Sequence, residues 1–212
     1  MSQKLILVTG ATDGIGKQTA LELAKMQHEV IVHGRNEERG KQVVSSLKKL
    51  SGNEKIHYLN ADLCYFEEIT KLANQVKKKF SHLDVLINNA GVFENEEIIL
   101  PNGIERTFMI NHMACFSLTL QLLDLLRNSD EARIVIVSSM AQAGTIDFDN
   151  LNAEKYFDGY NAYAVSKLAN VLFTYKLSRL LAGTSVTANC LHPGVIRTKL
   201  LQAGWGGGGA SV

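Results

Sequence analysis

Hydrophobic and polar positions follow two patterns that alternate along the chain. Short apolar runs rich in β-branched residues occur at 4–8, 29–33, 55–60, 84–88, 133–139 and 185–192. Between them, apolar positions recur with helical spacing at 16–27, 37–50, 66–80, 104–127 and 160–182. The strand runs are nearly continuous, which is typical of strands covered on both faces. Strands that alternate with helices in this way predict a doubly wound, parallel α/β sheet in a single domain.

Composition narrows the range of functions. A chain of 212 residues with 46% hydrophobic residues can bury a sizeable core. The net charge of +1 offers no electrostatic reason to expect nucleic acid or an anionic membrane as a partner. Three cysteines, Cys64, Cys115 and Cys190, lie far apart without metal-ligand spacing, which favours a reducing compartment. The first apolar run is too short for a signal peptide or a membrane span, so we expect a cytoplasmic protein.

A glycine-rich turn, T-G-A-T-D-G-I-G at 9–16, joins the first predicted strand to the first predicted helix. Gly10, Gly14 and Gly16 permit a tight turn and let the backbone approach a pyrophosphate, and the helix N-terminus adds free N–H groups. This context predicts a nucleotide site in a Rossmann-type fold. An ordinary glycine-rich turn is the alternative.

The end of the second strand bears on which nucleotide would bind. A dinucleotide fold usually has an acidic residue there for the ribose hydroxyls, but Gly34 occupies that position and Arg35 follows. A guanidinium can bind a 2′-phosphate in bidentate fashion, and Lys17 would assist. NADP(H) is therefore favoured over NAD(H). The alternative is that Arg35 only pairs with Glu37 or Glu38.

The stretch Y-A-V-S-K at 163–167 supplies candidate acid–base chemistry. Tyr163 and Lys167 are four residues apart and share one face of a helix. A phenol has an ordinary pKa of about 10, which a neighbouring ammonium lowers. The pair is a candidate proton carrier, although the Y-x-x-x-K spacing also occurs by chance on surface helices.

Several motifs in order resemble one family over nearly the whole chain, the short-chain dehydrogenases/reductases. They are the turn at 9–16, A-D-L at 61–63, N-N-A-G at 88–91, Asn111, the serines at 138–139, the 163–167 stretch and H-P-G-V-I-R-T at 192–198. S-K-L-A-N-V-L-F-T at 166–174 and the long spacer before Tyr163 resemble the retinol-dehydrogenase-like branch. Many members of that branch have a membrane-anchoring N-terminus, which the short first apolar run leads us not to expect here.

The resemblance implies four catalytic residues. Tyr163 would exchange a proton with the substrate oxygen, and Lys167 would lower the tyrosine's pKa and bond the nicotinamide ribose. Ser139 would hold the substrate oxygen; Ser138 is the alternate, because neighbours on a strand point to opposite faces. Asn111 would mark a local helix distortion that holds a water, or else be a tolerated polar residue in a helix.

The resemblance also implies a cofactor-binding set. Asp62 and Leu63 would contact the adenine, Asn89 to Gly91 would lie along the adenosine and ribose, and 193–198 would cover the nicotinamide. The full set is Gly10, Thr12, Gly14, Ile15, Gly16, Arg35, Asp62, Leu63, Asn89, Ala90, Gly91, Tyr163, Lys167, Pro193 and Thr198. His33, His112 and His192 lack spaced metal partners and are assigned no chemistry.

The expected activity is NADP(H)-dependent interconversion of an aldehyde or ketone with its alcohol. Val92, Phe93 and Met140 carry no charge, which favours an apolar substrate. The family implies a homodimer or homotetramer built on the helices that begin near 104 and 160. A non-catalytic NADP(H)-binding regulatory or scaffold protein is the alternative from another class.

The domain boundaries follow from the same resemblance. Residues 1–198 would form the dinucleotide-binding and catalytic domain, and 199–212 would begin a substrate loop followed by a glycine-rich tail. Family members usually continue with a further helix and a seventh strand, which we expect this chain to lack. One edge of the sheet would then lie open.

Overall fold

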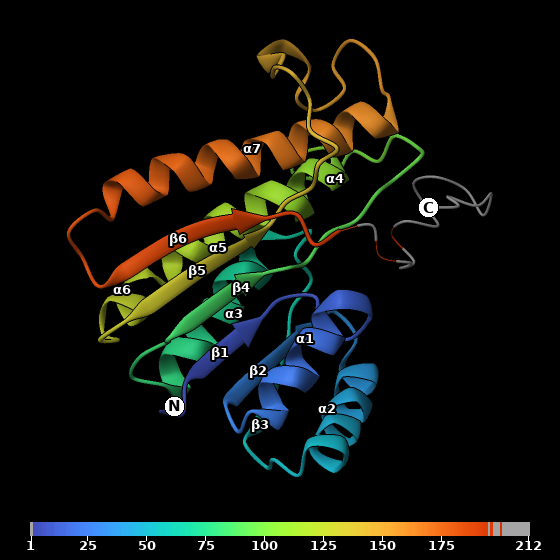
Figure 1. The fold of residues 1–212 in the computed structure, drawn as a ribbon. Coiled ribbons are helices and arrows are strands. Elements are labelled where there is room, and N and C mark those ends of the chain that lie inside the picture. The colour runs from blue at the N-terminus through green and yellow to red at the C-terminus, as the bar shows by residue number, and fades with distance from the viewer. Residues whose placement is uncertain (1, 195, 197–199, 201–212) are drawn as a thin grey trace.

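Six parallel strands form the central sheet of the computed structural model, which describes residues 2–194, 196 and 200. The strands run in the order β3-β2-β1-β4-β5-β6 (Figure 1). Their bounds are β1 (Leu5–Val8), β2 (Glu29–Gly34), β3 (Ile56–Asn60), β4 (Val85–Asn88), β5 (Ala132–Val137) and β6 (Val186–Leu191). The chain reverses its winding direction between β1 and β4, and the crevice outside the carboxyl ends of such strands is where ligands bind in open α/β sheets. The predicted doubly wound sheet is confirmed.

Helices cover both faces of this sheet (Figure 1). One face packs against α1 (Gly14–Lys25) and α2 (Glu37–Ser51), whose apolar side chains join Ile6, Val8, Val30 and Val32 in one core cluster. The other face packs against α3 (Phe66–Lys79), α5 (Ala114–Gln121), α6 (Leu123–Arg127) and α7 (Gly159–Leu180). Each face is therefore closed by burial of apolar helix stripes, the main favourable term in folding.

The region from 104 to 127, predicted as one continuous helix, is divided in the structure. It contains the short α4 (Arg106–Phe108), a π-helical turn at Met109–Met113, then α5 and α6. In the π-turn the Ala114 N–H donates to the Met109 carbonyl, five residues back. Leu122, with φ −97° and ψ 1°, separates α5 from α6. The prediction of a single helix was wrong because a π-turn adds one residue without changing the apolar pattern enough to be seen.

The strands nearest the β6 edge also differ from the prediction that all strands are covered on both faces. In β6 the side chains alternate, with Val186 and Ala188 buried but Thr187 and Asn189 exposed. Leu191 is 44% exposed on that same side. Within the described residues no helix covers this face and no strand pairs with the outer edge of β6. The V-T-A-N alternation was a signal of one solvated face.

Three further observations concern membrane spans, metal ligands and thiols among the described residues. No helix among them is both long and apolar enough to cross a bilayer. No group of three or more His, Cys, Asp or Glu side chains in this part of the chain could hold a metal ion. Burial raises the pKa of the Cys64 thiol to about 11 and that of Cys115 to about 12, so neither is a reactive thiolate at neutral pH.

Candidate active site

The glycine-rich turn approaches a neighbouring strand end more closely than any side chain would allow. Gly10 has φ +63°, and a Cβ built on it would lie 2.8 Å from the Cα of Ala90. Gly16 is buried in the first turn of α1, where a Cβ would lie 2.6 Å from the Gly10 carbonyl oxygen. Asp13 caps this helix by accepting from the Gly14 N–H at 2.9 Å. The turn and the N-terminus of α1 that follows it fit a dinucleotide pyrophosphate.

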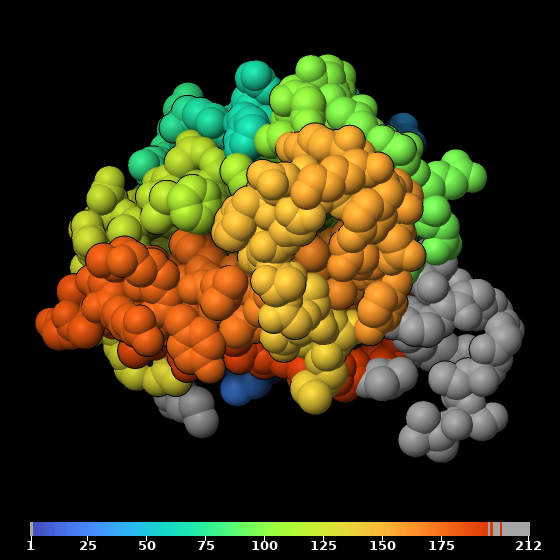
Figure 2. Space-filling model, turned by 90° about the horizontal axis from the view of Figure 1, so that it is seen from above, coloured from blue at the N-terminus to red at the C-terminus, as the bar shows by residue number. Residues whose placement is uncertain are grey.

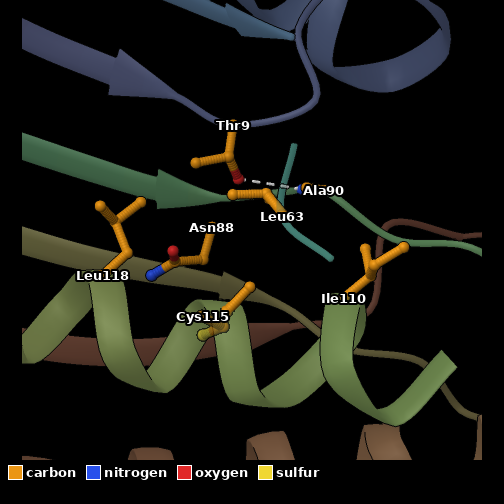
Figure 3. Close-up of a pocket in the computed structure, with 8 residues that line it drawn as sticks. Thr9, Leu63, Asn88, Ala90, Ile110, Cys115 and Leu118 are labelled. Atoms are coloured by element: carbon orange, nitrogen blue, oxygen red, sulfur yellow. Dashed lines mark hydrogen bonds between the residues drawn. The ribbon is translucent and has the colours of Figure 1, made fainter. Parts of the chain in front are cut away.

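Thr9 and Asn89 tie this turn to the end of β4. The Thr9 hydroxyl oxygen accepts from the main-chain N–H of Asn89 at 3.0 Å. It also accepts from the main-chain N–H of Ala90 at 3.0 Å (Figure 3). The Asn89 side-chain amide donates to the carbonyls of Thr9 at 2.8 Å and Gly10 at 3.3 Å. Asn89 was predicted to contact cofactor, but its amide is used in holding the turn. Thr9 was missed, although a threonine directly before the first glycine was a visible signal.

The small cavity drawn in Figure 3 lies beneath this junction. Its lining includes Thr9, Asn88, Ala90 and Cys115, and its volume is about 10 Å³. This is room for about one water molecule and excludes a substrate. The predicted site lies on the carboxyl side of the strands, outside this cavity.

His33 braces the same turn from β2. It is 2% exposed; its Nδ1 accepts from the Gly10 N–H at 3.2 Å, and its Nε2 lies 3.2 Å from the Ala61 carbonyl oxygen. Nε2 therefore carries the proton of a neutral ring. Burial lowers the pKa of His33 to about 4. The residue is structural, as the absence of metal partners suggested.

Arg35 is exposed directly after β2, beside the glycine turn. The Thr12 side chain lies against Gly34, because a Cβ on Gly34 would come within 2.5 Å of the Thr12 methyl carbon. Glu37 pairs with Lys41 at 2.6 Å, and in the described part of the chain no ion pair joins Arg35 to Glu37 or Glu38. The alternative role for Arg35 as an ion-pair partner of these residues is therefore not found.

The loop after β3 holds the predicted adenine contacts. Asp62 Oδ1 accepts from the Cys64 N–H at 3.0 Å, which fixes the loop conformation. Leu63 is 7% exposed and belongs to the core beneath the sheet edge. The Leu63 side chain is therefore turned into the protein, and contact with an adenine would have to come from its main chain.

Ser139 and Tyr163 meet at the carboxyl end of β5. Burial raises the pKa of Tyr163 above the ordinary phenol value, and a hydrogen bond with the Ser139 side chain, which acts to lower it, does not offset the effect of burial. Ser138 points the other way, and its hydroxyl donates to the Lys167 main-chain carbonyl at 2.9 Å. Of the two serines, Ser139 is the one beside the tyrosine.

Lys167 is buried next to the Tyr163 ring. Its ammonium lies 5.4 Å from the centre of the Tyr163 ring and donates to the Val137 carbonyl at 3.0 Å. Burial lowers the pKa of Lys167 to about 8. Burial raises the pKa of Tyr163 above its ordinary value, so the lowering expected from Lys167 is not seen as a net effect in this structure.

Asn111 lies within the π-turn and is 1% exposed. Its side chain makes two hydrogen bonds to the main chain after β4. Oδ1 accepts from the Val92 N–H at 2.8 Å, and Nδ2 donates to the Val92 carbonyl at 3.0 Å. Nδ2 also donates to the Ser166 hydroxyl at 3.0 Å. A Cβ on Gly91 would lie 3.3 Å from Asn111 Oδ1 and 3.6 Å from the Lys167 ammonium, so these groups converge at Gly91. The expected local distortion is present, and it is a π-turn.

Phe93 packs directly on the catalytic candidate. Its ring centre lies 5.2 Å from that of Tyr163, and it is 5% exposed. Phe93 was expected to line a substrate pocket, but it lies against the tyrosine ring.

The loop before α7 contacts the segment that follows β4. The Glu105 N–H donates to Asn152 Oδ1 at 3.3 Å, and Figure 2 shows the amber loop beside the green segment.

The last predicted contacts follow β6. Pro193 is half-buried after the strand, and His192 Nδ1 accepts from the Met140 N–H at 3.3 Å, which ties this segment to the residue after Ser139. Thr198 lies outside the described residues, as do 199 and 201–212 of the predicted substrate loop and tail.

Comparison with known families gives the identity of the fold. The family model described as short chain dehydrogenase matches residues 4–205. The chain belongs to the short-chain dehydrogenase family. The resemblance drawn from its motifs is confirmed.

Curated relatives place the chain in the retinol-dehydrogenase-like branch. It is 44% identical to human retinol dehydrogenase 13 over 202 residues, covering 93% of this chain and 60% of the relative. It is 42% identical to human polyprenol dehydrogenase over 206 residues, covering 94% of this chain and 62% of the relative. The chain therefore spans about three fifths of the length of the curated relatives it matches.

Solved structures of the family share the fold. A protein from Mycobacterium paratuberculosis superposes with a TM-score of 0.80 at 34% identity. The match covers 91% of this chain and 69% of the mycobacterial protein. RhlG from Pseudomonas aeruginosa was solved as an active-site complex with NADP. It gives a TM-score of 0.79 at 26% identity, and the match covers 95% of this chain and 76% of RhlG.

Proposed function

We propose that this chain carries the cofactor-binding and catalytic residues of an NADP(H)-dependent oxidoreductase that interconverts an aldehyde or ketone with its alcohol. The observation that carries the proposal is the convergence of Ser139, Tyr163 and Lys167 at the carboxyl end of β5. Proteins that only bind a nucleotide need the glycine turn but not these three residues together. A bound nicotinamide dinucleotide would supply or accept the hydride.

The proton chemistry follows from the environment of Tyr163. Because the pKa of Tyr163 lies above its ordinary value, the phenol is protonated at neutral pH and can donate to a carbonyl oxygen during reduction. In the reverse direction the phenolate would accept the proton of the alcohol. Ser139 would hold the same oxygen by a hydrogen bond and stabilise charge that develops on it.

Three features support NADP(H) as the cofactor. Gly34 leaves no carboxylate at the end of β2, and Arg35 is exposed beside the turn. A second guanidinium, that of Arg39, lies at the same end, where it pairs with Asp13 at 2.7 Å. The relative RhlG was solved with NADP. Arg35→Glu is expected to weaken NADPH binding by about tenfold or more while NADH binding is retained.

The names of the relatives support an apolar substrate. Retinol and polyprenol dehydrogenases are named for long, apolar alcohols. On this chain, Val92 and Phe93 carry no charge near Tyr163, and Met140 is 76% exposed directly after Ser139. We therefore propose an apolar alcohol or aldehyde as the substrate class.

A homodimer is proposed through α5 and α7. Phe116 and Phe173 lie 5.0 Å apart between ring centres and join the two helices, and the exposed apolar side chains around them are Leu120, Leu172 and Tyr175. An apolar patch on two adjacent helices marks a protein interface. A second copy of the chain can cover it symmetrically.

The test is turnover of NADPH with a panel that includes retinal, decanal and cyclohexanone. Wild-type chain should oxidise NADPH with at least one of them, and Tyr163→Phe should lower kcat by about 10²- to 10⁴-fold with little change in NADPH affinity. Tight NADPH binding without turnover on any of the panel would overturn the proposal and support the non-catalytic, regulatory alternative.

A further inference from the structure

Asn170 has no assigned role, yet it is a buried polar residue close to the proposed catalytic groups. It lies on α7, three residues after Lys167, and is 1% exposed. A buried amide carries a desolvation cost unless its donors and acceptor are paired. Both ends of the Asn170 amide are paired, and both partners are in the π-turn.

The donor end of Asn170 reaches the main chain of Asn111. Its Nδ2 donates to the Asn111 carbonyl oxygen at 3.0 Å. A π-turn displaces the regular hydrogen-bond ladder of a helix, so main-chain groups there need partners from outside the helix. Asn170 supplies such a partner from α7.

The acceptor end reaches the next residue of the same turn. Asn170 Oδ1 lies 3.0 Å from His112 Nδ1, so the neutral histidine donates this bond. Burial lowers the pKa of His112, which keeps the ring neutral and this donor assignment stable at neutral pH. One amide therefore fixes two successive residues of the π-turn.

The Asn111 side chain connects the π-turn held by Asn170 to the residues around Tyr163. It holds Val92, next to Phe93 on the Tyr163 ring, and it donates to Ser166. The Ser166 hydroxyl in turn donates to the Tyr163 carbonyl at 2.7 Å. A shift of the π-turn would therefore move the segment packed on Tyr163 and the helix turn that carries it.

We propose that Asn170 is a positioning residue for catalysis, acting through the π-turn and Asn111 on Tyr163. This inference rests on the proposed function. Asn170 touches neither the substrate nor the reacting atoms. A displacement of about 1 Å at reacting groups costs up to 10²-fold in rate, so a residue of this kind would affect turnover more than cofactor binding.

The main variant is Asn170→Leu, which is similar in size and removes both hydrogen bonds. The matched control is Thr174→Val, one turn further along α7, where a buried hydroxyl donates to the Asn170 main-chain carbonyl at 2.7 Å; this variant leaves both hydrogen bonds of the Asn170 side chain in place. Each variant is compared with wild type for kcat and KM on decanal, for NADPH Kd and for thermal midpoint.

We expect Asn170→Leu to lower kcat by about 10- to 100-fold with NADPH Kd within about threefold of wild type. Thr174→Val should keep kcat within about threefold.

A second pair of variants, His112→Phe and Asn170→Ser, distinguishes the effects of the two hydrogen bonds. The same pair tests the inference if Asn170→Leu does not fold. His112→Phe keeps an aromatic ring near Phe108 and Phe173 and removes only the hydrogen bond to Asn170 Oδ1. We expect a smaller loss of kcat than for Asn170→Ser, which removes both bonds with less packing stress. The opposite order would overturn the inference.

Two results overturn the inference in distinguishable ways. If wild type turns over decanal and Asn170→Leu keeps kcat within about threefold of Thr174→Val, Asn170 is only structural and the proposed function stands. If wild type binds NADPH but turns over none of the aldehydes and ketones of the panel, both the proposed function and this inference fail.

Discussion

Tyr163 shows how burial and acid–base chemistry compete within one residue. The motif correctly paired the phenol with Lys167, but spacing alone could not give the balance between burial and charge. In the folded chain the lysine contacts the ring and the Val137 carbonyl, and the phenol keeps a raised pKa. The result is a proton donor suited to carbonyl reduction at neutral pH.

Lys167 makes reduction sensitive to alkaline pH. Its pKa in the folded chain is about 8, so the ammonium that would bond the nicotinamide ribose loses its charge as pH rises through that value. We expect kcat/KM for NADPH, which reports on the free enzyme, to fall as pH rises through about 8. The measurement is the pH profile of NADPH oxidation at fixed, saturating aldehyde. A profile that is flat through this range would contradict the assignment.

His33 makes stability sensitive to acid. Its pKa is lowered from 6.5 to about 4, so the unfolded chain binds a proton between these values that the folded chain does not. Stability is therefore full above about 6.5 and falls as pH drops toward 4, by on the order of 3 kcal/mol. Urea unfolding at several pH values would measure this. His33→Gln should flatten the part of the acid dependence that this residue causes, and an unchanged dependence would refute it.

At the element scale, the turn between β1 and α1 combines a left-handed glycine with a close neighbour. The sequence predicted the turn and its glycines, because strand, turn and helix follow each other locally. It could not predict the contact with Ala90, which lies 80 positions away and is brought in by the pairing of β1 with β4.

Gly10→Ala tests that close contact. A Cβ at Gly10 meets the Ala90 Cα at 2.8 Å, whereas Gly52, with φ +66°, has open space around its Cβ position. Gly52→Ala should therefore cost only the left-handed strain, about 1 kcal/mol, while Gly10→Ala should cost about 2 kcal/mol more and weaken NADPH binding. Denaturant unfolding of both variants gives the comparison. Equal losses would mean that the contact with Ala90 is unimportant.

The π-turn is the element that pattern analysis did not find. One inserted residue shifts an apolar stripe by less than a helical turn. Asn111 was singled out because of the family resemblance and because asparagine is a poor helix former. Its partners Val92, Ser166 and Asn170 come from segments 19, 55 and 59 residues away, so only the folded chain identifies them.

At the scale of the whole molecule, apolar surface remains on α5 and α7. We expect a symmetric dimer through this patch, and Leu120→Glu should dissociate it because a charge would be buried at the interface. Leu50→Glu is the control: Leu50 is 60% exposed on α2, against 45% for Leu120 on α5. Light scattering after size exclusion gives the mass. Monomeric wild type, or equal dissociation by both variants, would contradict the proposal.

The sequence alone determined the local features of this protein: the alternating strands and helices, the glycine turn, the order of motifs and so the family. These depend on neighbours a few positions apart, whose periodicity and backbone preferences can be seen without a fold. Tertiary structure decided which serine meets Tyr163, where the Lys167 ammonium lies and what Asn89 and Asn170 hold. Those outcomes depend on burial and on contacts between distant segments, because desolvation and hydrogen-bond geometry are properties of the packed molecule.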